Sequence, residues 1–290
     1  MSPATNGALR VLVTGGGGML AHDLVPALRA AGHVVTPLDR GDLDITDAAE
    51  CLAGVEGHDL VVNCAAWTAV DAAETDEAGA FAVNAVGAAN LARSASRAGA
   101  RLLQISTDYV FDGNATEPYP VDHPIAPRSA YGRTKAAGEW AVQALCPQSW
   151  IIRTAWLYGA GGGNFVTTML RLAAERDTLT VVDDQVGQPT WTVDLADLIV
   201  RLVAAPAAYG VHHGAASGQT TWRGLAQAVF EERGLDPERV QPTTSAALGL
   251  PAPRPSWSVL SHDSLERAGI TPIGDWRASL NAYLAGSATA

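Results

Sequence analysis

Repeated alternation of strand-like and helix-like segments is the feature that most constrains the fold of this chain. Short, mainly apolar runs at 9–14, 34–38, 60–63, 102–106 and 151–154 are typical of buried strands. The segments between them have helical spacing, and the Ala-rich stretch 77–98 predicts a helix with an apolar stripe of Phe81, Val83, Val86 and Leu91. The alternation predicts an α/β fold with a doubly wound parallel sheet, covered by helices on both faces.

Four consecutive glycines, Gly15 to Gly18, follow the first strand and precede the first helix. Ala21 stands where the usual dinucleotide-binding fingerprint has its third glycine. Glycine permits a tight turn and lets backbone N–H groups approach a pyrophosphate, which the helix N-terminus then stabilises. We therefore predict a dinucleotide site that includes Gly15, Gly18, Met19 and Leu20.

Two neighbouring residues at the end of the second strand favour different cofactors. Asp39 lies roughly 20 residues beyond the glycine turn, where an acid accepts hydrogen bonds from the adenosine ribose of NAD. Arg40 could instead bind the 2′-phosphate of NADPH. We favour NADPH, with NADH also usable. Asp44 and Ile45 are candidates to contact the adenine, although the segment Asp44-Ile45-Thr46-Asp47 could equally be a helix N-cap region, and the two interpretations are compatible.

The residues that follow the next two strands are candidates for the reacting end of the cofactor. Ligands of parallel sheets bind beyond the carboxyl ends of the strands. Ala65 and Ala66 follow the third strand, and Ser106 and Thr107 lie at the end of the fourth. Only one of the two hydroxyls can point inward because side chains alternate along a strand, and we favour Thr107 over Ser106.

Tyr131 and Lys135 are four residues apart, a spacing that places both side chains on one face of a helix. A phenol beside an ammonium group is a proton donor whose pKa should be lowered toward the working pH. Downstream of a dinucleotide site, this pair indicates an enzyme that transfers a hydride to or from a nicotinamide. Tyr131 would give a proton to a carbonyl oxygen held by Thr107, and Lys135 would bind the nicotinamide ribose.

Composition excludes several other functions and places the protein in a reducing compartment. The net charge of −11 argues against a nucleic-acid-binding surface. No apolar run approaches the roughly 20 residues that span a bilayer. Cys51, Cys64 and Cys146 show no paired spacing, which favours free thiols in the cytoplasm.

Longer motifs give the chain a clear resemblance to the extended short-chain dehydrogenase/reductases, and within them to the dTDP-4-dehydrorhamnose reductases. The most specific segments are Ser-Thr-Asp-Tyr-Val-Phe-Asp-Gly at 106–113 and Asp-Gln-Val-Gly-Gln-Pro-Thr at 184–190. Further matching segments are 14–21, 63–71, 131–135, 153–159, 164–165, 254–255 and Asn84.

The resemblance implies a Rossmann domain over 1–160, to which some later segments return, and a smaller α/β region over 161–290 that binds the sugar nucleotide. It implies Thr107, Tyr131 and Lys135 as the catalytic set. Thr68 and Asn84 would join the cofactor site, and Asp108, Trp156 and Asn164 the substrate site. Gln185 in an irregular loop and Arg254 in a proline-stiffened loop are further candidates, Arg254 as a diphosphate clamp.

The implied reaction is reduction of the 4-keto group of a dTDP-4-dehydro-6-deoxyhexose, with dTDP-4-dehydro-L-rhamnose to dTDP-L-rhamnose preferred. A reductase of another dTDP-4-keto-deoxysugar, of the streptose or antibiotic type, is one alternative. A non-catalytic regulatory subunit, like the β subunit of methionine adenosyltransferase, is the other. A 4,6-dehydratase is disfavoured because Tyr109 stands where those enzymes have an acid. We expect metal-independent catalysis by a monomer or homodimer.

Overall fold

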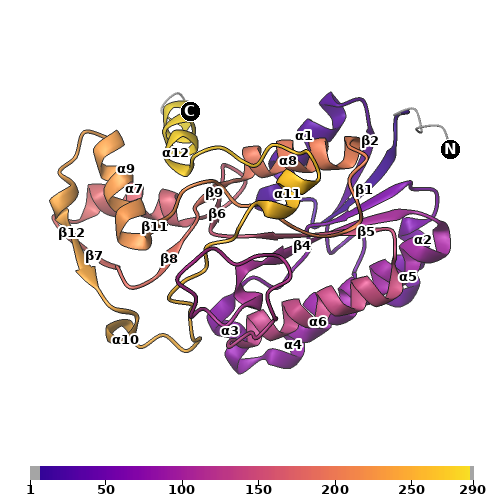
Figure 1. Ribbon diagram of the computed structural model, residues 1–290, viewed down its shortest axis with the longest axis horizontal. Coiled ribbons are helices and arrows are strands. Elements are labelled where there is room, and N and C mark those ends of the chain that lie inside the picture. The colour runs from indigo at the N-terminus through magenta and orange to yellow at the C-terminus, as the bar shows by residue number, and fades with distance from the viewer. Residues whose placement is uncertain (1–6, 288–290) are drawn as a thin grey trace.

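A six-stranded parallel sheet forms the centre of the computed structural model, which describes residues 7–287 (Figure 1). Its spatial order is β2-β1-β3-β4-β5-β10, and every neighbouring pair is parallel. The strands are β1 (Arg10–Thr14), β2 (Val34–Leu38), β3 (Leu60–Asn63), β4 (Arg101–Thr107), β5 (Ser149–Thr154) and β10 (Gly210–His213). The predicted doubly wound α/β class is confirmed.

Helices cover both faces of this sheet, as Figure 1 shows. One face carries α1 (Met19–Ala30), α8 (Thr192–Ala204) and α11 (Asp263–Arg267); the other carries α2 (Ala48–Val55), α5 (Ala88–Ala98) and α6 (Ala130–Leu145). Alternate residues of β1 supply the two cores, because Val11 and Val13 pack with the first set and Leu12 packs with the second. A strand apolar on both faces is what a doubly covered parallel sheet requires.

The helix predicted over 77–98 is not a single α-helix. It consists of α4 (Glu77–Phe81), a π-helical segment η1 (Ala82–Gly87) and α5. The predicted apolar stripe is wrong in two places; the wider π turn changes the direction of Val86, whereas Phe81 precedes the π segment. Phe81 and Val86 are exposed, whereas Leu91 is buried as expected. Asn84 is turned inward instead.

A second cluster of elements lies beyond the carboxyl ends of the sheet and contains its own apolar core (Figure 1). Its larger elements are α7 (Phe165–Glu175), β7 (Leu179–Val182), α9 (Trp222–Glu232), β12 (Val240–Thr243) and α12 (Trp276–Ser287). Its short elements are β6 (Leu157–Tyr158), β8 (Val186–Gly187), β9 (Thr190–Trp191), β11 (Thr220–Thr221), η3 (Pro237–Arg239) and α10 (Ser245–Leu248). Segments η2 (Asp108–Val110) and α3 (Val70–Thr75) complete the described chain.

Two elements from the second half of the chain belong to the central layer. Helix α8 packs on α1, and β10 pairs with β5 at the edge of the sheet. The division near residue 160 stays a prediction, and its outer ends, 1–6 and 288–290, lie outside the described residues. No helix within 7–287 is long and apolar enough to cross a bilayer.

Candidate functional site

The glycine turn after β1 is too tight for another residue at its first position. Gly15 has φ +68°, and a Cβ on it would lie 2.8 Å from Ala65 N. The N–H of Gly17 donates to Asp39 Oδ1 at 2.6 Å. Helix α1 then begins after Gly18, and no side chain of the described residues caps it. Its first amides are therefore open to an anion, as a pyrophosphate site requires.

The residues predicted for the adenosine end lie together on the segment after β2. Arg40 is 83% exposed, and its Nε lies 3.5 Å from Asp44 Oδ2. The alternative prediction for this segment, a helix N-cap region, is confirmed, because Asp47 accepts hydrogen bonds from the first amides of α2. The predicted apolar contact of Ile45 with adenine is not supported, since its side chain is buried in the core.

The strand order reverses between β1 and β3, and a buried polar chain fixes the two strand ends at this point. Thr14 Oγ1 donates to Asn63 Oδ1 at 2.7 Å, and Asn63 Nδ2 donates to Gln104 Oε1 at 2.8 Å. The N–H of Ala65 donates to Asn63 Oδ1 at 3.1 Å. Ala65 and Ala66 are thereby held beside the glycine turn, at the switch point where dinucleotides bind in such sheets.

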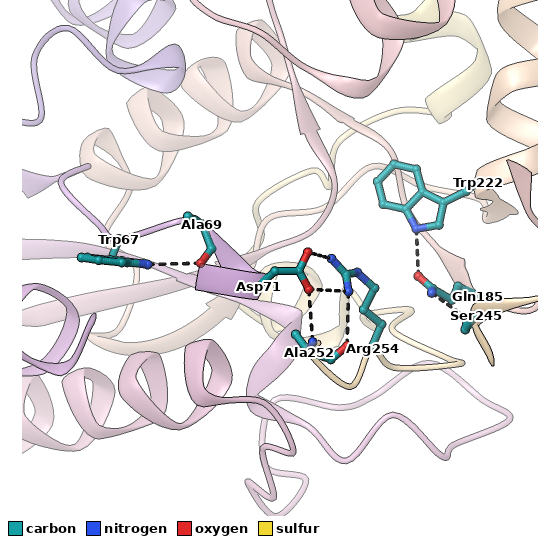
Figure 2. Close-up of polar contacts among 8 residues, drawn as sticks. All are labelled: Trp67, Ala69, Asp71, Gln185, Trp222, Ser245, Ala252 and Arg254. Carbon is teal, nitrogen blue, oxygen red and sulfur yellow. Dashed lines mark hydrogen bonds and ion pairs between the residues drawn. The ribbon is translucent and has the colours of Figure 1, made fainter. Parts of the chain in front are cut away.

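Asn84 uses its whole side chain within the protein. Its Oδ1 accepts from Trp67 N at 2.8 Å, and its Nδ2 donates to Trp67 O at 3.1 Å and Thr134 Oγ1 at 3.0 Å. It therefore fastens the segment after β3, where Thr68 is exposed, to the helix turn that bears Tyr131 and Lys135. The Trp67 indole in turn donates to Ala69 O (Figure 2).

The three predicted catalytic side chains meet where α6 passes the end of β4. The Lys135 ammonium is buried and donates to Ile105 O at 2.7 Å. A hydrogen bond between the Tyr131 and Thr107 hydroxyls acts to lower the pKa of the phenol. The ring of Tyr109 packs edge-on against Tyr131, with centroids 5.5 Å apart.

The predicted lowering of the Tyr131 pKa is wrong for this arrangement. Burial outweighs the Thr107 hydrogen bond and raises the phenol pKa to about 12. Burial also lowers the pKa of Lys135 to about 8, against the opposing effect of Glu139. At neutral pH the phenol therefore keeps its proton, which is the form a donor to a carbonyl oxygen needs.

Ser106 is engaged elsewhere, which favours Thr107 as the predicted carbonyl-binding hydroxyl. Its Oγ donates to Glu139 Oε1 at 2.5 Å. Glu139 also forms a buried ion pair with Arg153, with an Nη2–Oε2 distance of 2.7 Å. Arg153 Nη1 donates to Val121 O at 3.0 Å. This buried pair fixes α6 to β5 one helical turn beyond Lys135.

Asp108 is a buried carboxyl group beside the catalytic set. Its Oδ1 accepts from Thr107 Oγ1 at 2.8 Å, whereas its Oδ2 is buried without a hydrogen bond among the described residues. Burial raises the pKa of Asp108 to about 6, although Ser258 and Thr107 oppose the shift. An unpaired buried oxygen at this place can accept a hydrogen bond from a ligand hydroxyl.

The Trp156 side chain is held in place by stacking. Trp156 is the sole non-glycine among residues 7–287 with positive φ, at 47°. Its ring stacks on Trp222, with centroids 3.7 Å apart and planes 6° apart. A Cβ on Gly187 would come within 2.7 Å of the Trp156 ring, so glycine is needed there. Part of Trp156 remains exposed and could contact a sugar.

Gln185 and Asn164, both predicted to bind substrate, are engaged in structural bonds. The Trp222 indole donates to Gln185 Oε1 at 3.0 Å, and Gln185 Nε2 donates to Ser245 Oγ at 2.8 Å (Figure 2). Asn164 is the N-cap of α7 in a capping box with Thr167. Direct substrate contacts are therefore unsupported for both residues, and Gln185 instead fixes the Trp222 ring.

Arg254 lies in the loop after α10 and forms a two-pronged ion pair with Asp71 (Figure 2). Its Nη2 is 2.7 Å from Asp71 Oδ2, and its Nη1 is 3.0 Å from Asp71 Oδ1. Ala252 N donates to the same carboxylate at 3.1 Å. The role of Arg254 as a diphosphate clamp stays a prediction, and in this structure its guanidinium holds a carboxylate.

The sequence predicts no role for three features of this site: Asp71, Trp222 and the Glu139–Arg153 pair. Asp71 and Arg153 lie within motifs of the reductase resemblance, and Glu139 lies one helical turn beyond Lys135. Their positions in the sequence could therefore have identified Asp71, Arg153 and Glu139 as candidates. Trp222 follows the N-cap Thr221 of α9 and had no local signal.

Comparison with known proteins identifies the family of the chain. The RmlD substrate binding domain family matches residues 9–288. A dTDP-4-dehydrorhamnose reductase from Streptomyces griseus is 53% identical over 278 residues, covering 93% of this chain and 91% of that protein. A probable dTDP-4,6-dihydroxy-2-methyloxan-3-one 4-ketoreductase from Streptomyces antibioticus is 48% identical, covering 94% and 93%.

A solved structure gives the same result in three dimensions. The dTDP-4-dehydrorhamnose reductase of Bacillus anthracis, in complex with NADP, is 36% identical with a TM-score of 0.93. The alignment covers 97% of this chain and all of that one (100%). On these matches, the chain belongs to the RmlD substrate binding domain family.

Proposed function

We propose that this protein reduces the 4-keto group of a dTDP-4-dehydro-6-deoxyhexose with NADPH, and that dTDP-4-dehydro-L-rhamnose is its substrate. The observation that carries the proposal is the meeting of Tyr131, Thr107 and buried Lys135 at the carboxyl end of β4. The names of the Streptomyces griseus and Bacillus anthracis relatives support the substrate, and the NADP bound to the latter supports the cofactor.

The residues around the glycine turn fit a dinucleotide. The uncapped N-terminus of α1 and the close approach of Gly15 to Ala65 would accommodate its pyrophosphate. Arg40, largely exposed beside Asp39, could turn toward a 2′-phosphate. When bound, NADPH supplies the hydride for the reaction.

Tyr131 donates its proton to the carbonyl oxygen as the carbonyl carbon accepts the hydride. The product is an alcohol, and the proton lost by Tyr131 is replaced from solvent. Thr107 holds the carbonyl oxygen and Lys135 stabilises the phenolate; Lys135 would also hold the nicotinamide ribose. Asp108 accepts a hydrogen bond from a sugar hydroxyl through its unpaired Oδ2.

Reduction of a different dTDP-4-keto sugar is the second candidate, because the Streptomyces antibioticus relative is a probable 4-ketoreductase of another substrate. Elimination is a weaker candidate. Burial raises the pKa of Tyr109, the residue at the dehydratase acid position, so this phenol is a poor acid at neutral pH.

NADPH and NADH oxidation at 340 nm, with enzymatically generated dTDP-4-dehydro-L-rhamnose, tests the proposal. Substrate-dependent oxidation is expected. Tyr131→Phe should reduce turnover by roughly 10²–10⁴ and leave NADPH binding nearly intact. Tyr209→Phe is the matched control, because this exposed tyrosine lies at the amino end of the sheet. Unchanged turnover in Tyr131→Phe would refute the mechanism, and nicotinamide binding without oxidation would favour another keto sugar or a non-catalytic role.

A further inference from the structure

The Asp71–Arg254 pair joins two parts of the chain that are 183 residues apart. Asp71 is in the first turn of α3, directly after the segment that follows β3 and borders the predicted cofactor site. Arg254 lies between Pro253 and Pro255. Gly113 packs so closely on Pro255 that a Cβ would lie 2.6 Å from its Cα. The arginine is therefore presented by a fixed loop.

The loop that bears Arg254 lies near the reacting centre, because Pro253 and Pro255 line a small cavity together with Tyr109, whose ring packs against Tyr131. The Arg254 charge also acts to lower the pKa of Tyr109. Both groups of the pair keep contact with solvent, because the Arg254 side chain is 19% exposed and that of Asp71 is 38% exposed. An incoming anion can therefore reach the guanidinium without unfolding of the loop.

We propose that Asp71 is an internal competitor for Arg254, which exchanges the Asp71 carboxylate for the diphosphate of the sugar nucleotide when the ligand binds. This inference rests on the proposed function for the identity of the ligand. A guanidinium presents a planar fork that suits a carboxylate and a phosphate equally, so the two anions compete for the same donors. Asp71 thereby lowers the affinity of Arg254 for every anion that has to displace it, by the same factor in each case.

The Asp71→Asn variant isolates the charge. An asparagine Oδ1 can still accept from Ala252 N, so the loop keeps its backbone anchor. Removing the competing charge should tighten dTDP binding by about two- to fivefold, because this ratio of dissociation constants corresponds to the free energy of a partly exposed ion pair. Arg254→Gln should weaken dTDP binding, and Asp71→Asn should have no effect when combined with Arg254→Gln.

Calorimetric titration of dTDP and thymidine into the NADPH-saturated full chain measures these effects. The gain should appear for dTDP and be absent for thymidine, which a general change of the fold would not produce. Asp59→Asn is the control, because Asp59 forms a comparable two-pronged pair with Arg10 at the amino end of the sheet and likewise accepts from a backbone N–H. It should leave dTDP affinity unchanged.

Weaker or unchanged dTDP binding in Asp71→Asn would overturn the inference. So would a gain that persists in the double variant or that extends to thymidine. Since dTDP has no keto group, this titration is independent of the reduction assay. A chain that shows the dTDP pattern but reduces no keto sugar would refute the proposed reaction while supporting the competition for Arg254.

Discussion

The buried Glu139–Arg153 pair offers a stability test of how the active-site helix is supported. The Glu139 side chain is 0% exposed and that of Arg153 is 2% exposed. In Glu139→Gln the Ser106 hydrogen bond can persist, but the Arg153 charge is left without its counter-charge. Breaking one side of a buried pair costs about 3–5 kcal/mol. At about 2 °C per kcal/mol for a chain of this size, Tm should fall by roughly 6–10 °C.

Thermal unfolding of Glu139→Gln and of Glu139→Gln/Arg153→Met tests this reasoning. The double variant removes both buried charges and should recover most of the lost stability, because a neutral core of similar volume has no charge to desolvate. A double variant less stable than the single one, or a single variant within 1 °C of wild type, would refute it. Exposed Arg171–Glu175 supplies the control, since Glu175→Gln should change Tm little.

Three further predictions concern the catalytic and substrate-side residues. Because burial raises the pKa of Asp108 to about 6, above the unfolded value, ionisation destabilises the fold as the pH rises. Asp108→Asn should therefore be more stable than wild type by about 3 kcal/mol above pH 6, and this gain in stability should disappear toward pH 4. Urea unfolding at several pH values measures the difference, and a gain that does not change with pH would contradict the prediction. Because burial lowers the pKa of Lys135 to about 8, kcat should decline above pH 8 as Lys135 loses its proton. If kcat of Lys135→Arg declined over the same pH range, the decline would belong to another group. Trp222→Leu removes the stack on Trp156 and should raise KM for the sugar nucleotide roughly two- to tenfold, with KM for NADPH unchanged; equal changes in both would indicate general disruption.

Local sequence patterns predicted the parts of the structure that depend on local interactions. The apolar runs marked β1 to β5 to within about two residues at each end. The glycine turn could be recognised because only glycine allows φ +68° against Ala65. The common helical face of Tyr131 and Lys135 followed from their spacing.

Features that depend on long-range packing could not be predicted in this way. The pKa of Tyr131 is set by burial beneath other segments, which outweighs the effect expected from a residue four positions away. Asn164 is a polar loop residue like many ligand-binding ones, yet it caps α7. The partner of Arg254 lies 183 residues earlier, and no local pattern identifies Asp71 as that partner.

The most direct test of the proposed reaction follows the hydride itself. dTDP-4-dehydro-L-rhamnose would be incubated with the protein and NADPH deuterated at both C4 positions of the nicotinamide, and the product examined by mass spectrometry and NMR. The proposal predicts a dTDP-6-deoxyhexose with one deuterium, located at C4 of the sugar. A product without deuterium, or with deuterium at another carbon, would contradict it.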